Sequence, residues 1–124
     1  MRRLATTFAV LVSLALAGGA LAAGRGPIPA WPRLPGTWSH AEINVSIKKT
    51  PHTLILDRGR IVQLSATQVT LRERDGTTVV VPLSPSTLVV IGGLPSTTFD
   101  LRRGMNAQTM RIDGGAAVRL RVIF

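Results

Sequence analysis

The side chains that could act as general acids or bases are two histidines and six acidic residues. Nucleophilic hydrolysis needs a base beside the nucleophile and a third group that orients the base. His40 and His52 are the candidate bases, but neither lies in a Gly-x-Ser-x-Gly turn or a comparable signature. Asp57, Asp75 and Asp113 lie beside glycine or in expected turns, where Asp is favoured for its backbone hydrogen bonds. The sequence therefore predicts that the protein is not an enzyme.

Metal-binding side chains are also few. The two histidines are twelve residues apart and there is no cysteine, which makes a poor site for zinc or copper. Met105 and Met110 are soft donors that could bind Cu(I), but methionine more often fills a hydrophobic core. The sequence predicts no metal and no cofactor, and the lack of cysteine excludes a disulfide framework.

The arginine residues are the clearest indication of function in the sequence. The chain carries 15 Lys or Arg residues and 6 Asp or Glu residues, a net charge of +9. Outward positions of strand-like runs hold the candidate anion-binding residues Arg72, Arg74, Arg111, Arg119 and Arg121. If their strands are neighbours, these residues form one cationic stripe that would attract an anionic cell-wall polymer, such as teichoic acid, or lipid headgroups.

Two observations limit this hypothesis. Single-stranded nucleic acid usually requires aromatic side chains on which its bases stack, and these strand faces have none, so nucleic acid is a disfavoured partner. The arginines could also form an ordinary solvated face, in which their aliphatic stems cover apolar surface. The strand order decides between the two interpretations.

Residues 23–40 form a proline- and glycine-rich tether that precedes the domain. Proline at this density removes backbone donors and favours extended chain. Trp31 and Trp38, the only indoles, both lie here. We expect either that they dock a protein partner, or that one of them folds back over an open end of the domain.

From Glu42 onward, apolar residues recur with a period of two, which is typical of strands. Turn residues separate eight such runs, at 42–49, 52–56, 60–65, 68–74, 77–83, 86–91, 107–112 and 117–124. The strongest hairpin signal is Asp75-Gly76, and Asp57-Arg58-Gly59 indicates another turn. The run 117–124, "AVRLRVIF", alternates apolar residues with arginine and would close the domain, with Phe124 as a terminal plug.

The period breaks near residues 96–103, where a short helical turn is expected. Ser96 could cap the turn, and Gly104 lies where a left-handed C-terminal cap belongs. Phe99, with Leu101 or Met105, would then plug an end of the sheet. The sequence predicts an all-β domain over residues 41–124, a small OB-like or SH3-like β-barrel of about six to eight short antiparallel strands.

Three stretches resemble a family of small secreted bacterial domains of unknown function with an OB-like β-barrel. These stretches are the "GRI" strand, the "TLRERDGTTV" hairpin and the segment "VVIGGLPSTTFDLRRGM". The resemblance covers Asp57 to about Ile112. It implies the barrel fold, and it implies no activity and no site residues.

The first 22 residues resemble a secretory signal peptide. Arg2 and Arg3 precede the apolar residues 4–17, and Ala20-Leu21-Ala22 supplies small residues before a cut between Ala22 and Ala23. Cleavage there predicts a secreted or extracytoplasmic protein of the cell envelope. The alternative is an uncleaved anchor, since residues 4–23 are nearly long enough to span a bilayer.

Taken together, these features predict a secreted, non-enzymatic β-barrel module that binds an anionic cell-envelope component. The alternative is a structural or protein–protein interaction module that docks through the Pro/Trp tether. An extracytoplasmic enzyme is the third and weakest interpretation. The sequence leaves the ligand, the strand order and the oligomeric state open.

Overall fold

The computed structural model describes residues 6–14 and 28–123. It confirms the all-β class. The strands are β1 (Thr6–Leu14), β2 (His40–Ile47), β3 (Thr50–Leu64), β4 (Gln68–Arg72), β5 (Thr78–Pro82), β6 (Leu88–Ile91), β7 (Leu94–Ser96), β8 (Asn106–Ile112) and β9 (Ala117–Ile123), with one 3₁₀ turn, η1 (Thr98–Asp100). Within the described ranges, no helix has the length and apolar character needed to cross a membrane.

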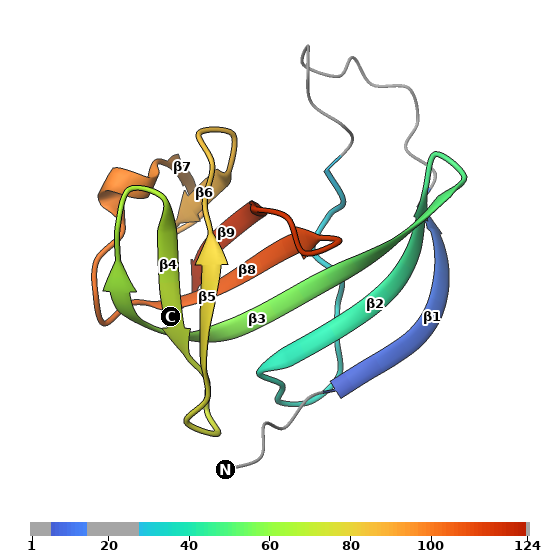
Figure 1. The fold of residues 1–124 in the computed structure, drawn as a ribbon, viewed down its shortest axis with the longest axis horizontal. Helices are drawn as coiled ribbons and strands as arrows, with labels where there is room; N and C mark the ends of the chain where they lie inside the picture. Colours follow the sequence, from blue (N-terminus) through green and yellow to red (C-terminus); the bar gives the residue numbers. More distant parts are fainter. Residues whose placement is uncertain (1–5, 15–27, 124) are drawn as a thin grey trace.

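The nine strands form one hydrogen-bonded sheet in the order β1-β2-β3-β8-β9-β6-β7, and the β4–β5 hairpin branches from β3. The sheet is not closed, so the OB-like or SH3-like type of barrel that the strand pattern predicted is not confirmed. Two of its pairings are parallel, β1 with β2 and β6 with β9, where only antiparallel strands were expected. Figure 1 shows β3 crossing the molecule from its turn with β2 to the β4–β5 hairpin.

Strand β3 corrects one prediction directly. The segment Asp57-Arg58-Gly59 is not a turn but lies inside a single strand of 15 residues that joins two of the predicted runs. Its first part pairs with β2 and β8, and its last part pairs with β4. Asp57 and Gly59 were misread because both residue types are common in turns. Here each meets a tertiary requirement that is described below.

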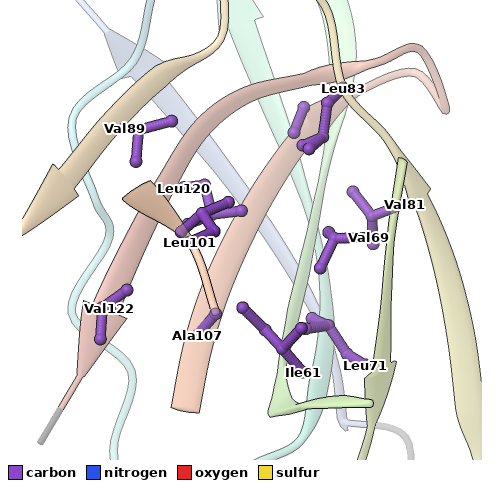
Figure 2. Packing of buried hydrophobic residues seen from close by; sticks show 11 residues of the cluster. Ile61, Val69, Leu71, Val81, Leu83, Val89, Leu101, Ala107, Leu120 and Val122 are labelled. Carbon is purple, nitrogen blue, oxygen red and sulfur yellow. The ribbon is translucent and has the colours of Figure 1, made fainter. Parts of the chain in front are cut away.

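The buried hydrophobic residues form two clusters, which lie on opposite faces of the sheet. The first lies between β3, the β4–β5 hairpin, β6, β8 and β9 (Figure 2), and its fully buried members include Ile61, Leu71 and Leu120. The second contains the β2 residues Ile43, Val45 and Ile47, which share one face as their spacing predicted, with contributions from β3, β8 and Trp38. The sheet therefore needs cover on both sides.

The chain segment before β2 covers the second hydrophobic cluster. Residues 28–39, which we call the arm, are the described part of the predicted tether and contain no helix or strand. Trp38 belongs to the second cluster, and Trp31 and Leu34 pack against it. Residues 23–27 lie outside the described part of the chain.

The turns agree with the sequence only in part. The Asp75-Gly76 hairpin is confirmed, but Gly76 alone has positive φ there, so the type I′ geometry is absent. Lys48 and Lys49 both have positive φ and form the tight β2–β3 turn. The helical turn at 96–103 is confirmed as η1, with Thr97 rather than Ser96 before its first residue.

Leu101 and Phe99 were both expected to plug an end of the sheet, but only one of them is buried. Leu101 is 1% exposed and belongs to the first cluster, whereas Phe99 is 82% exposed and fills nothing. Met105 is partly buried against the same cluster. The prediction for Phe99 was wrong because a one-turn helix buries only the face that meets the sheet. Phe124 lies outside the described residues.

The predicted signal peptide is described only at residues 6–14, which form β1 beside β2 in the full chain. Its cleavage site at Ala22–Ala23, and the basic residues Arg2 and Arg3, lie outside the described residues. Cleavage and secretion remain predictions.

Candidate functional site

An open pocket of about 320 Å³ lies where β3, β4, β8 and β9 meet. We call it the arginine pocket, and it is lined by Arg58, Gly59, Arg60, Arg72, Arg74, Asn106 and Ile123. Four of these seven residues carry a guanidinium group. None of the lining residues is acidic, so the pocket concentrates positive charge within a small volume.

Strand register brings the pocket together. Arg60 of β3 is opposite Arg72 of β4 on one side and opposite Asn106 of β8 on the other. Asn106 is in turn opposite Ile123 of β9. Side chains directly opposite one another across a ladder point to the same face of the sheet. Four strands therefore contribute to one hollow, although their residues are far apart in the sequence.

Gly59 allows β4 to approach β3 closely. A Cβ atom at this position would lie 2.5 Å from the carbonyl oxygen of Arg72 and 3.2 Å from the amide nitrogen of Glu73. Real Cβ atoms essentially never approach other atoms to less than 3.0 Å. Glycine at residue 59 therefore lets the end of β4, which carries Arg72 and leads to Arg74, lie directly against β3.

Arg121 of β9 is connected to the pocket residue Arg58 through Gln108. Arg58 and Arg121 both donate to the side-chain oxygen of Gln108, over 3.3 Å and 3.1 Å. Burial lowers the pKa of Arg58 from its ordinary value, and the positive charge of Arg121 lowers it further. Two guanidinium groups thus share one neutral acceptor, an arrangement that an anion would stabilise.

The arm lies over these arginines. Trp38 stacks on Arg58 at 4.3 Å from the guanidinium carbon to the ring centroid, and Trp31 stacks on Arg121 at 4.6 Å. Such cation–π contacts contribute about 0.5–2 kcal/mol each. Trp38 is only 5% exposed. A partner that docked on this indole would first have to displace the arm, so partner docking through Trp31 and Trp38 stays a prediction without contact evidence.

Arg119 holds the arm rather than lining the pocket. Its Nε donates to the carbonyl oxygen of Pro29 over 2.7 Å, and burial lowers its pKa. Arg111 is not among the pocket residues either, and its guanidinium group donates to the carbonyl oxygen of Gly114 over 3.5 Å.

The structure thus divides the five predicted arginines into three groups. Arg72 and Arg74 line the pocket, Arg121 is joined to it through Gln108, and Arg119 and Arg111 have separate roles. Arg58 and Arg60 complete the pocket. Neither was predicted as a site residue, because Arg58 was assigned to a turn and Arg60 stood at the start of a separate run. Only the pairing of β3 with β4 shows that they belong to the site.

On the opposite face of β3 lies an acid–histidine cluster formed by His40, Asp57 and Glu73. His40 Nδ1 is 2.7 Å from Asp57 Oδ1, and one potential ligand atom from each of the three residues lies within 4.8 Å of the others. The three residues are 8%, 0% and 2% exposed. His40 and Asp57 could only be considered separately in the sequence, because they are 17 positions apart.

A second histidine–carboxylate pair lies at the surface. His52 Nδ1 is 2.5 Å from Asp113 Oδ2, and the Thr53 amide donates to Asp113 Oδ1 over 2.8 Å. These bonds lower the pKa of the Asp113 carboxyl, with the Thr53 amide as the larger cause and His52 as the second. No third acidic, histidine or cysteine side chain joins this pair in the described part of the chain. The pair joins the start of β3 to the β8–β9 turn.

Comparison of the chain with protein-family models, with curated proteins and with solved structures gave no match.

Proposed function

We propose that this protein is a secreted, non-enzymatic β-module that binds an anionic component of the cell envelope in the arginine pocket. The observation that supports the proposal is the convergence of Arg58, Arg60, Arg72 and Arg74 around one open hollow with no acidic lining residue. Guanidinium groups bind phosphate and carboxylate through paired N–H donors. The expected ligand is therefore a polymer with repeated phosphate groups, such as teichoic acid, or an anionic lipid headgroup.

The electrostatics of the neighbouring residues favour the same ligand class. Arg58 and Arg121 point at one amide oxygen, and their mutual repulsion is reduced when an anion binds nearby. The hollow, of about 320 Å³, is large enough to hold one or two phosphate groups beside the arginine side chains. Asn106 adds a neutral donor at its rim.

We also propose that the fold is of the OB-like type implied by the resemblance over residues 57–112. OB-folds are partly open Greek-key barrels, and a long strand shared between two parts of the sheet is consistent with that architecture. The pocket would then lie on the outer surface of the barrel, where polymer chains can reach it.

Binding to purified wall teichoic acid tests the function. Replacing Arg72 and Arg74 together by Ala should weaken binding by roughly 100-fold or more, because each charge-assisted hydrogen bond contributes about 1.5–3 kcal/mol. Arg72→Lys keeps the charge but loses the paired donors, so it should weaken binding by a smaller factor. Raising the salt concentration should weaken binding of the unaltered protein.

Arg111→Ala is the matched control, because it removes the same charge from an arginine outside the pocket. It should leave the affinity within about threefold of the unaltered protein. Equal losses for Arg111→Ala and for a pocket variant would show that only net charge matters. Retention on teichoic acid that does not change with salt would refute the electrostatic account.

A further inference from the structure

The acid–histidine cluster presents ligand types that metal ions use, in a site shielded from water. His40 at the start of β2, Asp57 in the middle of β3 and Glu73 just after β4 meet on the face opposite the arginine pocket. Each of the three residues is less than one-tenth exposed.

The distances are close to those of one shared ion. Bonds from zinc to nitrogen or oxygen ligands are about 2.0–2.2 Å long, so two ligand atoms in a tetrahedral site lie about 3.3–3.6 Å apart. The three candidate ligand atoms lie within 4.8 Å of one another, and His40 Nδ1 is 2.7 Å from Asp57 Oδ1. Side-chain movements of up to about one ångström would bring all three onto one ion.

A separate observation points to the same place. The hydroxyl oxygen of Thr109 is fully buried and has no hydrogen-bond partner among the described residues. Thr109 of β8 is directly opposite Asp57 of β3, so its side chain lies on the same face of the sheet as the Asp57 carboxylate. Buried hydroxyl groups nearly always have a partner. An ion at the cluster, or a water molecule bound to it, would supply one.

We propose that His40, Asp57 and Glu73 bind a divalent transition-metal ion of the Zn²⁺ or Mn²⁺ type, with Thr109 beside it. Two carboxylates and a neutral imidazole carry a formal charge of −2, which matches a divalent cation. One nitrogen and several oxygen donors suit zinc or manganese. Cu(I) prefers thiolate and thioether ligands, and Ca²⁺ prefers six to eight oxygen ligands. The role is structural, because the ion would join β2, β3 and the end of β4.

This inference is independent of the proposed function. The arginine pocket and the cluster lie on opposite faces of β3, where Asp57 and Arg58 point in opposite directions. Loss of anion binding and loss of metal binding can therefore be measured separately, in different variants.

The test is calorimetric titration of the full chain with ZnCl₂ after treatment with a chelator. We expect one ion per chain, and a melting temperature that rises by several degrees with Zn²⁺ and returns after chelation. Glu73→Gln and Asp57→Asn keep the side-chain shapes but remove ligand charge, and each should weaken Zn²⁺ binding at least tenfold. Asp113→Asn is the matched control: it alters the other histidine–carboxylate pair, so zinc affinity should not change.

No heat of binding and no thermal shift in the unaltered chain would overturn the proposal. A loss of binding in Asp113→Asn equal to that in Glu73→Gln would also overturn it, because the ion would then bind at the surface. If both cluster variants fail to fold, the heat of binding and the thermal shift of the unaltered chain still test the proposal. Co²⁺ bound at this cluster should give the visible spectrum of a low-coordinate mixed nitrogen and oxygen site, and the spectrum of the hexaaqua ion alone would refute it.

Discussion

Gly59 is the position at which a single methyl group should have the largest effect on this structure. In Gly59→Ala the new Cβ would meet the backbone of Arg72 at 2.5 Å, whereas ordinary contacts begin at 3.4 Å. Strand β3 and the end of β4 would have to separate by about 0.9 Å, the difference between those distances. The atoms that clash belong to the backbone, so no rotation of a side chain can relieve the contact.

Overpacking of this kind costs about 1–3 kcal/mol, and a weakened ladder hydrogen bond beside it adds about 1 kcal/mol. We therefore expect Gly59→Ala to lower the free energy of unfolding by about 2–4 kcal/mol. A loss of that size lowers the melting temperature of a domain of this length by roughly 10–20 °C. Urea unfolding followed by circular dichroism measures the first quantity, and a thermal scan measures the second.

Gly115→Ala is the control for this prediction. The nearest atom to its new Cβ is the carbonyl oxygen of Ile112 at 3.4 Å, and Gly115 does not have positive φ. Its free energy of unfolding should stay within about 0.5 kcal/mol of the unaltered chain. An equally mild effect of Gly59→Ala would show that β4 does not lie over residue 59 as described.

Two further predictions concern pH and the arm. The lowered pKa of Asp113 gives the folded protein stability above the ordinary carboxyl value of 3.8, and this stability is lost as the pH falls through the lower folded value. Asp113→Asn should therefore flatten the stability profile below about pH 4, measured by urea unfolding, and an unchanged profile would contradict the assignment. Trp38→Ala removes a side chain that is 5% exposed and stacks on Arg58, so it should cost about 3–5 kcal/mol. A cost below about 1 kcal/mol would mean that the arm is not packed on the sheet in solution.

The sequence predicted the local features of the fold well. The period of two at Ile43, Val45 and Ile47 gave the correct buried face, because alternation is a local property of a strand. The hairpin at Asp75-Gly76 and the helical turn near Thr98–Asp100 were likewise visible from turn and capping residues. The turn predicted at Asp57 and Gly59 was wrong, because the role of these residues depends on the segment that lies beside them in the fold.

The site was less accessible to sequence reasoning for the same reason. Arg72 and Arg74 were identified from alternation alone, and their convergence with Arg58 and Arg60 follows only from the β3–β4 register. Arg119 shows the converse, since a strand-face arginine proved to hold the arm through Pro29, which is 90 residues away in the sequence. Contacts at that separation leave no periodic signal in the chain.

The position of the two indoles determines what optical probes can report. The chain contains two Trp residues and no Tyr, and both indoles lie in the arm. Trp38 and Trp31 stack on Arg58 and Arg121, which belong to β3 and β9. Intrinsic fluorescence therefore reports whether the arm is seated, whereas far-ultraviolet circular dichroism reports the sheet. If the arm detaches before the sheet unfolds, the two signals will give separate transitions, and the difference between them measures the stability of arm docking.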